Sequence, residues 1–193
     1  MTRSLNGGLL STFDDNNTDT LSWVTHTARS TLSGVDYVSI CVVHGCGEFS
    51  SVGATDPLAQ RADALQQELG EGPSVDAALG VGVAHCDNVE NDLRWRGYGT
   101  RSAEMGIRSQ TAIELRYSGR TIGVLNLYST QLGPLEDGVI DAAQVLAQDA
   151  STVLRMTQAV DDMAIGVTGW SQGPTGWSRV EREGAAPEAA VAS

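Results

Sequence analysis

The sequence predicts an α+β protein built around a central antiparallel β-sheet of five or six strands. Helix and strand patterns follow one another in the order helix, two strands, two helices, strand, helix, two strands and a long helix. Both pairs of consecutive strands are joined by short turns, which indicates hairpins and therefore antiparallel pairing. We expect the N- and C-terminal helices on one face of this sheet and the short helices and loops over the other.

Regular structure begins with a helix and a hairpin. Over residues 18–32 the apolar positions recur at helical spacing, and Gly34 lies just past the predicted helix end. Residues 35–44 (VDYVSICVVH) are rich in β-branched side chains and apolar on both sides near their end, which is typical of an inner strand. After a glycine-containing turn, residues 49–54 supply the second strand of this hairpin.

Two helices meet at a tight corner in the stretch ALQQELGEGPSVDAAL. Asp56 followed by Pro57 is the signature of a capped helix start, and Gly70 is placed to end that helix. Gly72-Pro73 then opens a shorter helix that closes at Gly80. The apolar stripe expected for the longer helix consists of Leu58, Ala62, Leu65 and Leu69.

The second half of the chain supplies the remaining strands. Residues 81–86 form a short predicted strand, and a polar loop then leads to a helix over residues 98–105. Residues 108–117 alternate between apolar and polar, whereas residues 121–128 (TIGVLNLY) are nearly continuously apolar. A Ser-Gly turn joins these two segments, which makes them the clearest hairpin in the sequence.

A long helix is predicted over residues 135–160, and it sets the domain limits. A helix of this length overhangs a small sheet, so we expect part of it to pack against a partner helix. Residues 1–17, rich in Gly, Asn and Asp, are expected to be a flexible arm. A folded domain then covers residues 18–160, and the Gly- and Ala-rich residues 161–193 are expected to be a remnant or a disordered tail.

The charge balance argues against two classes of partner. The chain has 193 residues, with 12 basic residues, all of them arginine, against 24 acidic ones, for a net charge of −12. Binding to nucleic acid or to anionic membranes requires a basic surface, so neither is expected. The sequence contains no apolar run long enough for a membrane span and no signal-peptide pattern, which predicts a cytoplasmic protein.

Three stretches carry a resemblance to a known family: ATDPLAQRADALQQELGEGPSVDAAL, VAHCDNVENDLRW and RSAEMGIRSQTAIELRYSGRTIGVLNLYS. In order and spacing they resemble the GAF domain of actinobacterial GAF–ANTAR regulators, over roughly residues 20–160. The resemblance implies the GAF fold, with a small-molecule pocket under the loops on one face of the sheet. It also implies helices on the other face that form a homodimer.

In that family an ANTAR domain follows the GAF domain, binds RNA hairpins and causes transcription antitermination. Residues 163–167 (MAIGV) resemble the start of an ANTAR helix, but the sequence then turns into TGWSQGPTGW. Some 25 residues rich in Gly and Pro are too few for a three-helix module. We therefore expect the output domain to be truncated or absent, and no direct binding to nucleic acid.

The resemblance and the residue types together suggest a site for an unidentified small molecule, without a cofactor. The ligand is expected between the sheet and residues 70–76 and 87–105. Large rings in a polar loop and an amide that interrupts an apolar strand are suited to line such a pocket. The candidate ligand-binding residues are Cys86, Asp87, Trp95, Tyr98, Arg108 and Asn126.

Each of these features also has a purely structural interpretation. The corner at residues 70–73 can be a simple chain reversal, and Glu71 beside the helix start would repel an anion. Trp95 and Tyr98 can close the core, and Asn126 can be a buried residue whose amide is satisfied by its neighbours. No metal site is expected, because the three histidines lack ligand spacing.

These observations favour a non-enzymatic sensory domain in bacterial signal transduction or transcription regulation. The alternative is a GAF-type redox enzyme that acts on methionine sulfoxide through Cys46 or Cys86, although the cysteine spacing does not match that enzyme. A third possibility is a dimerisation scaffold whose pocket has collapsed.

Overall fold

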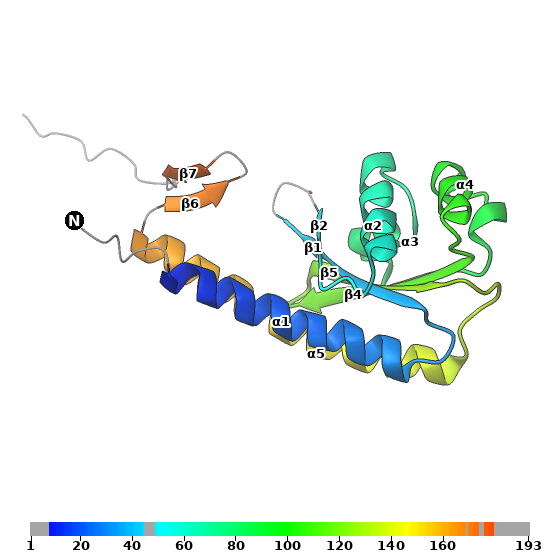
Figure 1. Ribbon diagram of the computed structural model, residues 1–193, viewed down its shortest axis with the longest axis horizontal. Coiled ribbons are helices and arrows are strands. Elements are labelled where there is room, and N and C mark those ends of the chain that lie inside the picture. Colours follow the sequence, from blue (N-terminus) through cyan, green and yellow to red (C-terminus); the bar gives the residue numbers. More distant parts are fainter. Residues whose placement is uncertain (1–7, 45–48, 169, 174–175, 180–193) are drawn as a thin grey trace, which may run out of the picture. The chain divides into compact units, whose positions relative to one another are not determined.

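An antiparallel sheet of five strands lies between two layers of helices (Figure 1). The strand order is β2-β1-β5-β4-β3, and every neighbouring pair is antiparallel. The strands are β1 (Tyr37–Val43), β2 (Phe49–Val52), β3 (Val83–Cys86), β4 (Ser109–Tyr117) and β5 (Arg120–Ser129). This architecture confirms the predicted fold class, including both hairpins.

The computed structural model describes residues 8–44, 49–168, 170–173 and 176–179. Two units make up the chain, residues 1–155 and residues 156–193. In the part that the structure describes, no helix is long and apolar enough to cross a membrane.

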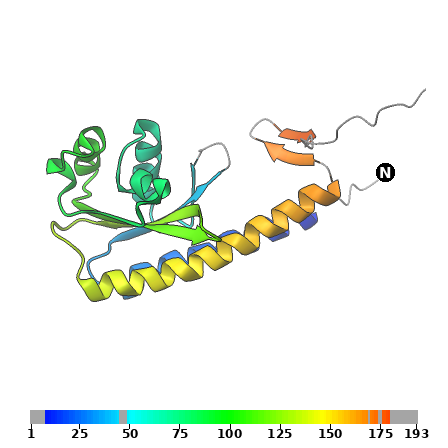
Figure 2. The ribbon, with the colours of Figure 1, turned by 180° about the vertical axis from the view of Figure 1, so that it is seen from behind.

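The helices divide between the two faces of the sheet, as Figures 1 and 2 show. One face carries α1 (Gly8–Thr31) and the first half of α5 (Asp137–Thr168). The other face carries α2 (Pro57–Leu69), α3 (Pro73–Asp76) and α4 (Arg96–Glu104). A π-helical turn, Ala77–Val81, follows α3, and a short 3-10 helix, Val89–Asn91, precedes α4.

The two faces of the sheet differ in chemistry. Under α1 and α5 the sheet buries one continuous apolar cluster, including Leu21 and Val24 of α1 and Ala143 and Leu154 of α5. Under α2, α3 and α4 two smaller apolar clusters alternate with buried polar side chains. The face under α1 and α5 therefore resembles an ordinary hydrophobic core, and the other face does not.

The corner between α2 and α3 follows the sequence prediction. Asp56 caps α2 by accepting a hydrogen bond from the Leu58 N–H at 2.8 Å, and Gly70 ends the helix in the left-handed conformation. Gly72 has a φ of 132°, and a Cβ there would lie 2.4 Å from Oε1 of Gln66. Glycine is thus required at residue 72 both for the backbone angle and for space.

The N-terminal helix is longer than the sequence prediction. α1 begins at Gly8, so most of the arm expected over residues 1–17 is helical, and residues 1–7 lie outside the described residues. Asn and Asp are weak helix formers, but adding a residue to an existing helix costs much less than starting one. The expectation of a flexible arm gave too much weight to the composition of residues 14–17.

The second unit also contains regular structure that was not expected in residues 161–193. α5 continues to Thr168, and β6 (Trp170–Gly173) pairs with β7 (Gly176–Arg179) in an antiparallel hairpin. The two copies of the motif TGW lead into these two strands. A repeated aromatic-polar pattern around Gly-Pro is a hairpin signal, whereas the Gly- and Ala-rich composition of this segment favours disorder.

Candidate ligand-binding site

Buried polar side chains meet around Asp63 between the sheet and α2. The Oδ1 atom of Asp63 accepts hydrogen bonds from Ser39 Oγ at 2.9 Å, Asn126 Nδ2 at 3.0 Å and Tyr128 OH at 2.5 Å. Its Oδ2 atom accepts one from Ser51 Oγ at 2.5 Å. Strands β1, β2 and β5 therefore all contribute donors to a single carboxylate.

Amide side chains extend this arrangement toward α3 and α4. Tyr98 OH donates to Gln110 Oε1 at 2.5 Å, and Gln110 Nε2 lies 3.4 Å from both Gln66 Oε1 and Asn126 Oδ1. Gln66 Oε1 also accepts the backbone N–H of Ser74 at 2.9 Å. We call the connected set the polar network: Ser39, Ser51, Asp63, Gln66, Ser74, Tyr98, Gln110, Asn126 and Tyr128.

Asp63 is buried without a cation. The side chain is 5% exposed, and no ion pair within 4.0 Å joins it to any described residue. Burial raises the pKa of Asp63, while the hydroxyl groups that donate to it oppose this rise. A buried carboxylate without a counter-charge costs folding free energy, which points to a role of Asp63 beyond stability.

The neighbouring acidic groups stay neutral. Burial raises the pKa of the Cys41 thiol and of the Tyr128 hydroxyl, and the charge of Asp63 raises both further. Burial also raises the pKa of Tyr98. Asp63 is therefore the network member that can carry a negative charge, and its raised pKa makes that charge dependent on pH.

The buried face of α2 explains why Asp63 and Gln66 enter the network. Ala59, Ala62, Asp63 and Gln66 are buried, and they follow the spacing i, i+3, i+4, i+7 of a single helix face. The predicted stripe of Leu58, Ala62, Leu65 and Leu69 is rotated from this face, and its three leucines are only partly buried. The spacing of these four residues marks a single helix face, but Asp63 and Gln66 are polar, so a search for apolar residues does not include them.

The structure brings together two of the six residues predicted to bind a ligand. Tyr98 and Asn126 both belong to the polar network and are connected through Gln110. Cys86 and Trp95 are buried in the apolar cluster beside Tyr98. These four residues lie on the predicted face of the sheet.

Asp87 and Arg108 lie at the surface instead. The Asp87 side chain is 56% exposed and contacts the His85 ring, and Arg108 Nη1 lies 3.4 Å from Glu90 Oε2 with its side chain 43% exposed. Each is paired with a neighbour outside the polar network. Both sit just before or after a strand end, where sequence spacing does not fix the direction of a side chain.

The corner at residues 70–73 is bonded to the start of α4. Glu71 Oε1 accepts the backbone N–H of Tyr98 at 2.6 Å, in the first turn of α4. This bond satisfies a free N–H group at a helix start, where a carboxylate is also favoured by the helix dipole. The corner thus ties α2 and α3 to the helix that carries Tyr98.

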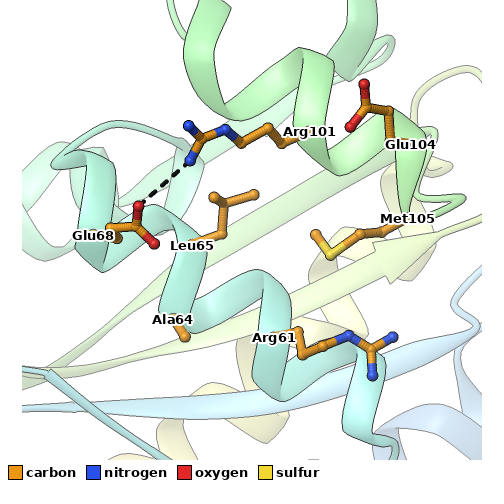
Figure 3. Close-up of a pocket in the computed structure, with 7 residues that line it drawn as sticks. All are labelled: Arg61, Ala64, Leu65, Glu68, Arg101, Glu104 and Met105. Carbon is orange, nitrogen blue, oxygen red and sulfur yellow. Dashed lines mark hydrogen bonds and ion pairs between the residues drawn. The ribbon is translucent and has the colours of Figure 1, made fainter.

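The polar network lies in the space predicted to hold a ligand, and its side chains bond to one another there. Two grooves lie elsewhere. One, of about 510 Å³, runs between α2 and α4, where Glu68 and Arg101 pair across it at 3.4 Å (Figure 3). The other, of about 600 Å³, lies between the end of β4 and α5 and includes Gln144 and Gln148. A ligand on the network face would therefore have to displace side chains that now bond to one another.

The described residues give little support for metal binding or for catalysis by a cysteine. No three His, Cys, Asp or Glu side chains of the described chain are grouped closely enough to hold a metal ion. Burial and Asp92 raise the pKa of Cys86 to about 12, which opposes formation of a reactive thiolate. Cys46, the other candidate, lies outside the described residues.

A conservative substitution tests the charge of Asp63. The pKa of this carboxyl is raised in the folded state, so at pH values between its ordinary pKa and the raised one the folded protein holds a proton that the unfolded chain has lost. The contribution of Asp63 to the free energy of unfolding therefore becomes more favourable as pH falls toward its ordinary pKa. In Asp63→Asn this dependence disappears.

We expect the wild type to gain stability relative to Asp63→Asn as pH falls through the raised pKa of Asp63 toward the ordinary pKa of an aspartate. Urea unfolding of both proteins at several pH values measures the difference, and other acidic groups cancel in the comparison. A difference that stays constant, or that favours Asp63→Asn as pH falls, would be inconsistent with a raised pKa.

The family found by comparison with known proteins is consistent with the observed fold. The model of a GAF domain matches residues 16–155, which is most of the chain. The chain belongs to the GAF domain family. No curated protein matches the chain as a sequence.

Solved GAF structures share the fold at low sequence identity. A GAF region from a protein of Geobacter sulfurreducens aligns with a TM-score of 0.65 at 13% identity, covering 76% of this chain and 98% of that one. A domain described as part of a two-component sensor histidine kinase from Sinorhizobium meliloti gives 0.62 at 16%, covering 76% and 95%. A free methionine-R-sulfoxide reductase from Thermoplasma acidophilum gives 0.60 at 14%, covering 75% and 96%.

Proposed function

We propose that this GAF domain is a cytoplasmic sensory module that binds a small molecule and regulates signal transduction or transcription. The polar network is the observation that carries the proposal. A sheet face that only stabilised the fold would be covered by apolar side chains, as the face under α1 and α5 is. Here a buried carboxylate, five amide or phenol side chains from α2, α4, β4 and β5, and several hydroxyl groups are gathered instead.

Binding of the ligand would change the positions of the terminal helices α1 and α5. Asn126 and Tyr128 belong to β5, and the opposite face of that strand packs under α1 and α5 through Leu125 and Leu127. A ligand that favours one position of β5 can therefore bias the terminal helices, by no more than its difference in affinity for the two states. The resemblance to GAF–ANTAR regulators supports transcription control as the output, and the net charge of −12 supports the absence of direct nucleic-acid binding by this chain.

A thermal-shift screen tests the proposal. The full chain is heated with a library of cationic, neutral and anionic metabolites, and a compound that binds only the folded state raises the melting temperature further as its concentration increases. The proposal predicts at least one such compound, with chemical-shift changes in the amide groups of Gln66, Gln110 or Asn126. A library in which no compound binds would favour a dimerisation scaffold.

We also propose that the chain is a homodimer formed through α1 and α5. Trp23 on α1 is 64% exposed and Val145 on α5 is 58% exposed, and both lie opposite the buried faces of their helices. Large apolar side chains that face away from the core are typical of an interface.

Val145→Glu is expected to convert the dimer to a monomer, because a charge would be buried in the interface. Leu132→Glu adds the same charge at a 64% exposed position in the loop before α5 and is expected to leave the dimer intact. Sedimentation equilibrium of the three proteins measures the change. A wild type that is monomeric, or a Val145→Glu protein that dimerises as well as the wild type, would contradict the interface.

The redox alternative is not favoured by the described cysteines. Cys41 and Cys86 are buried, and the pKa of each thiol is raised by that burial. A catalytic cysteine needs a lowered pKa and access to substrate. The reductase from Thermoplasma acidophilum shares the fold, which does not transfer its reaction to this chain.

A further inference from the structure

The charge of the polar network restricts the kind of ligand it can take. Its members supply one carboxylate together with hydroxyl, phenol and amide groups, and no Arg or His side chain among the described residues bonds to them. Hydroxyl and amide groups of Ser39, Ser51, Asn126 and Tyr128 donate to Asp63, and the Cys41 thiol also bonds to it; all of these groups are neutral. The network therefore holds negative charge that nothing in the described protein neutralises.

The uncompensated charge of Asp63 affects anionic, neutral and cationic ligands differently. An anion would be repelled by Asp63, and a neutral molecule would leave the carboxylate uncompensated in a low-dielectric site. A cation gains Coulomb energy there, and the carboxylate has already lost its water in the free protein. The net charge of −12 also attracts cations to the surface.

Resting on the proposed function, we propose that the ligand is a small organic cation with N–H donors, an amidinium or a primary ammonium, that pairs with Asp63. The Oδ2 atom is the available acceptor, because it accepts the Ser51 hydroxyl while Oδ1 already accepts three donors. An N–H group of the ligand would approach this atom. The amide oxygens of Gln110 and Asn126 could accept its other donors.

A removable cover over the network is formed by residues 73–81, the cover segment. Ser74 makes its polar contacts with the network: its N–H donates to Gln66 Oε1 at 2.9 Å, and its hydroxyl oxygen accepts a hydrogen bond from Asn126 Nδ2 at 3.1 Å. Ala77 and Ala78 supply apolar contacts with the sheet, whereas Leu79 is 80% exposed and Val81 60% exposed. The buried side chains of the segment are Pro73, Ser74 and Ala77, which are small and bury less apolar area than a Leu or Phe would.

The ends of the cover segment suit a hinge. Gly72 precedes it with a φ of 132°, and Gly80 lies near its end with a φ of 95°. A Cβ at Gly80 would contact nothing within 4 Å, so glycine there provides backbone freedom rather than space. Lifting the cover segment would free Gln66 and Asn126 to bond to the ligand.

Two charge series of matched shape test the ligand class. Acetamidine, acetamide and acetate form one series, and benzamidine, benzamide and benzoate form the other. Binding to the full chain is measured by chemical-shift titration at about pH 7.5 and up to about 10 mM of each compound. At least one amidine is expected to bind, while its amide and carboxylate partners do not.

Two variants test whether the amidines bind at Asp63. Asp63→Asn is expected to weaken amidine binding by about 30-fold or more, because it removes one partner of a buried charge pair. Glu68→Gln makes the same chemical change on α2, but in the groove beside α4, and is expected to bind like the wild type. Binding that survives in Asp63→Asn, or that is lost in Glu68→Gln, would overturn the assignment.

The wild type alone gives an independent result if Asp63→Asn does not fold. Cys41 on β1, Tyr98 on α4 and Tyr128 on β5 face the site and are neutral, so the pH dependence of amidine binding reports Asp63. Binding should weaken as pH falls and Asp63 takes up a proton, and pH-independent binding would overturn the assignment. If the amidines fail while neutral or anionic library compounds bind, the ligand class is wrong and the sensory function stands; if no compound of either set binds, both are wrong.

Discussion

Asp63→Ala is expected to destabilise the protein by about 3 kcal/mol, because it leaves buried donors without an acceptor. Ser39, Asn126 and Tyr128 lose the carboxylate oxygen that they share, and Ser51 loses its partner on the other oxygen. Burying an unpaired donor costs more than an average hydrogen bond contributes. Urea unfolding of the two proteins measures the difference.

Asp63→Asn is the matched control for this loss. Asn has nearly the same volume and keeps one acceptor, and hydroxyl groups can turn to accept from its amide. We expect its stability to lie within about 1 kcal/mol of the wild type at neutral pH. Equal effects of Ala and Asn would mean that the hydrogen bonds contribute little, and that the network is incidental to the fold.

Gly99→Ala is expected to destabilise the protein by about 3 kcal/mol or more. A Cβ at residue 99 would lie 2.0 Å from the backbone oxygen of Val89, and a backbone atom cannot turn aside as a side chain can. The change would push α4 away from the 3-10 helix and move Tyr98 away from Gln110. We therefore expect the substitution to weaken ligand binding as well as stability, which thermal unfolding and titration can measure together.

Gly138→Ala provides the comparison. Gly138 lies in the first turn of α5, and a Cβ there would contact nothing within 4 Å. Ala has a higher helix propensity than Gly, so this variant should be as stable as the wild type or more stable by up to about 1 kcal/mol. A Gly99→Ala protein that unfolds like Gly138→Ala would show that α4 can move without cost.

The fold could be predicted because its signals are local. The hairpin of β4 and β5, the capped start of α2 and its glycine end are each encoded within a few residues, and the structure has them as expected. Residues 1–17 and 161–193 were predicted less well, because composition alone suggested flexibility. Helix extension in α1 and the paired strands β6 and β7 depend on neighbours that composition does not include.

The candidate site was harder to predict because it depends on contacts between distant residues. Tyr98 and Asn126 were found because a ring in a polar loop and an amide in an apolar strand are conspicuous. Asp63 was missed because a carboxylate on a helix is ordinarily exposed. Its burial follows only from the register that brings Ser39, Asn126 and Tyr128 under α2.

The most direct measurement is a crystal structure of the full chain with a compound selected by the thermal-shift screen. The account predicts that the compound contacts Asp63 within the polar network and that residues 73–81 are displaced from their position over Gln66 and Asn126. A compound bound in the groove between α2 and α4, or in the groove between β4 and α5, with the polar network unchanged, would contradict it.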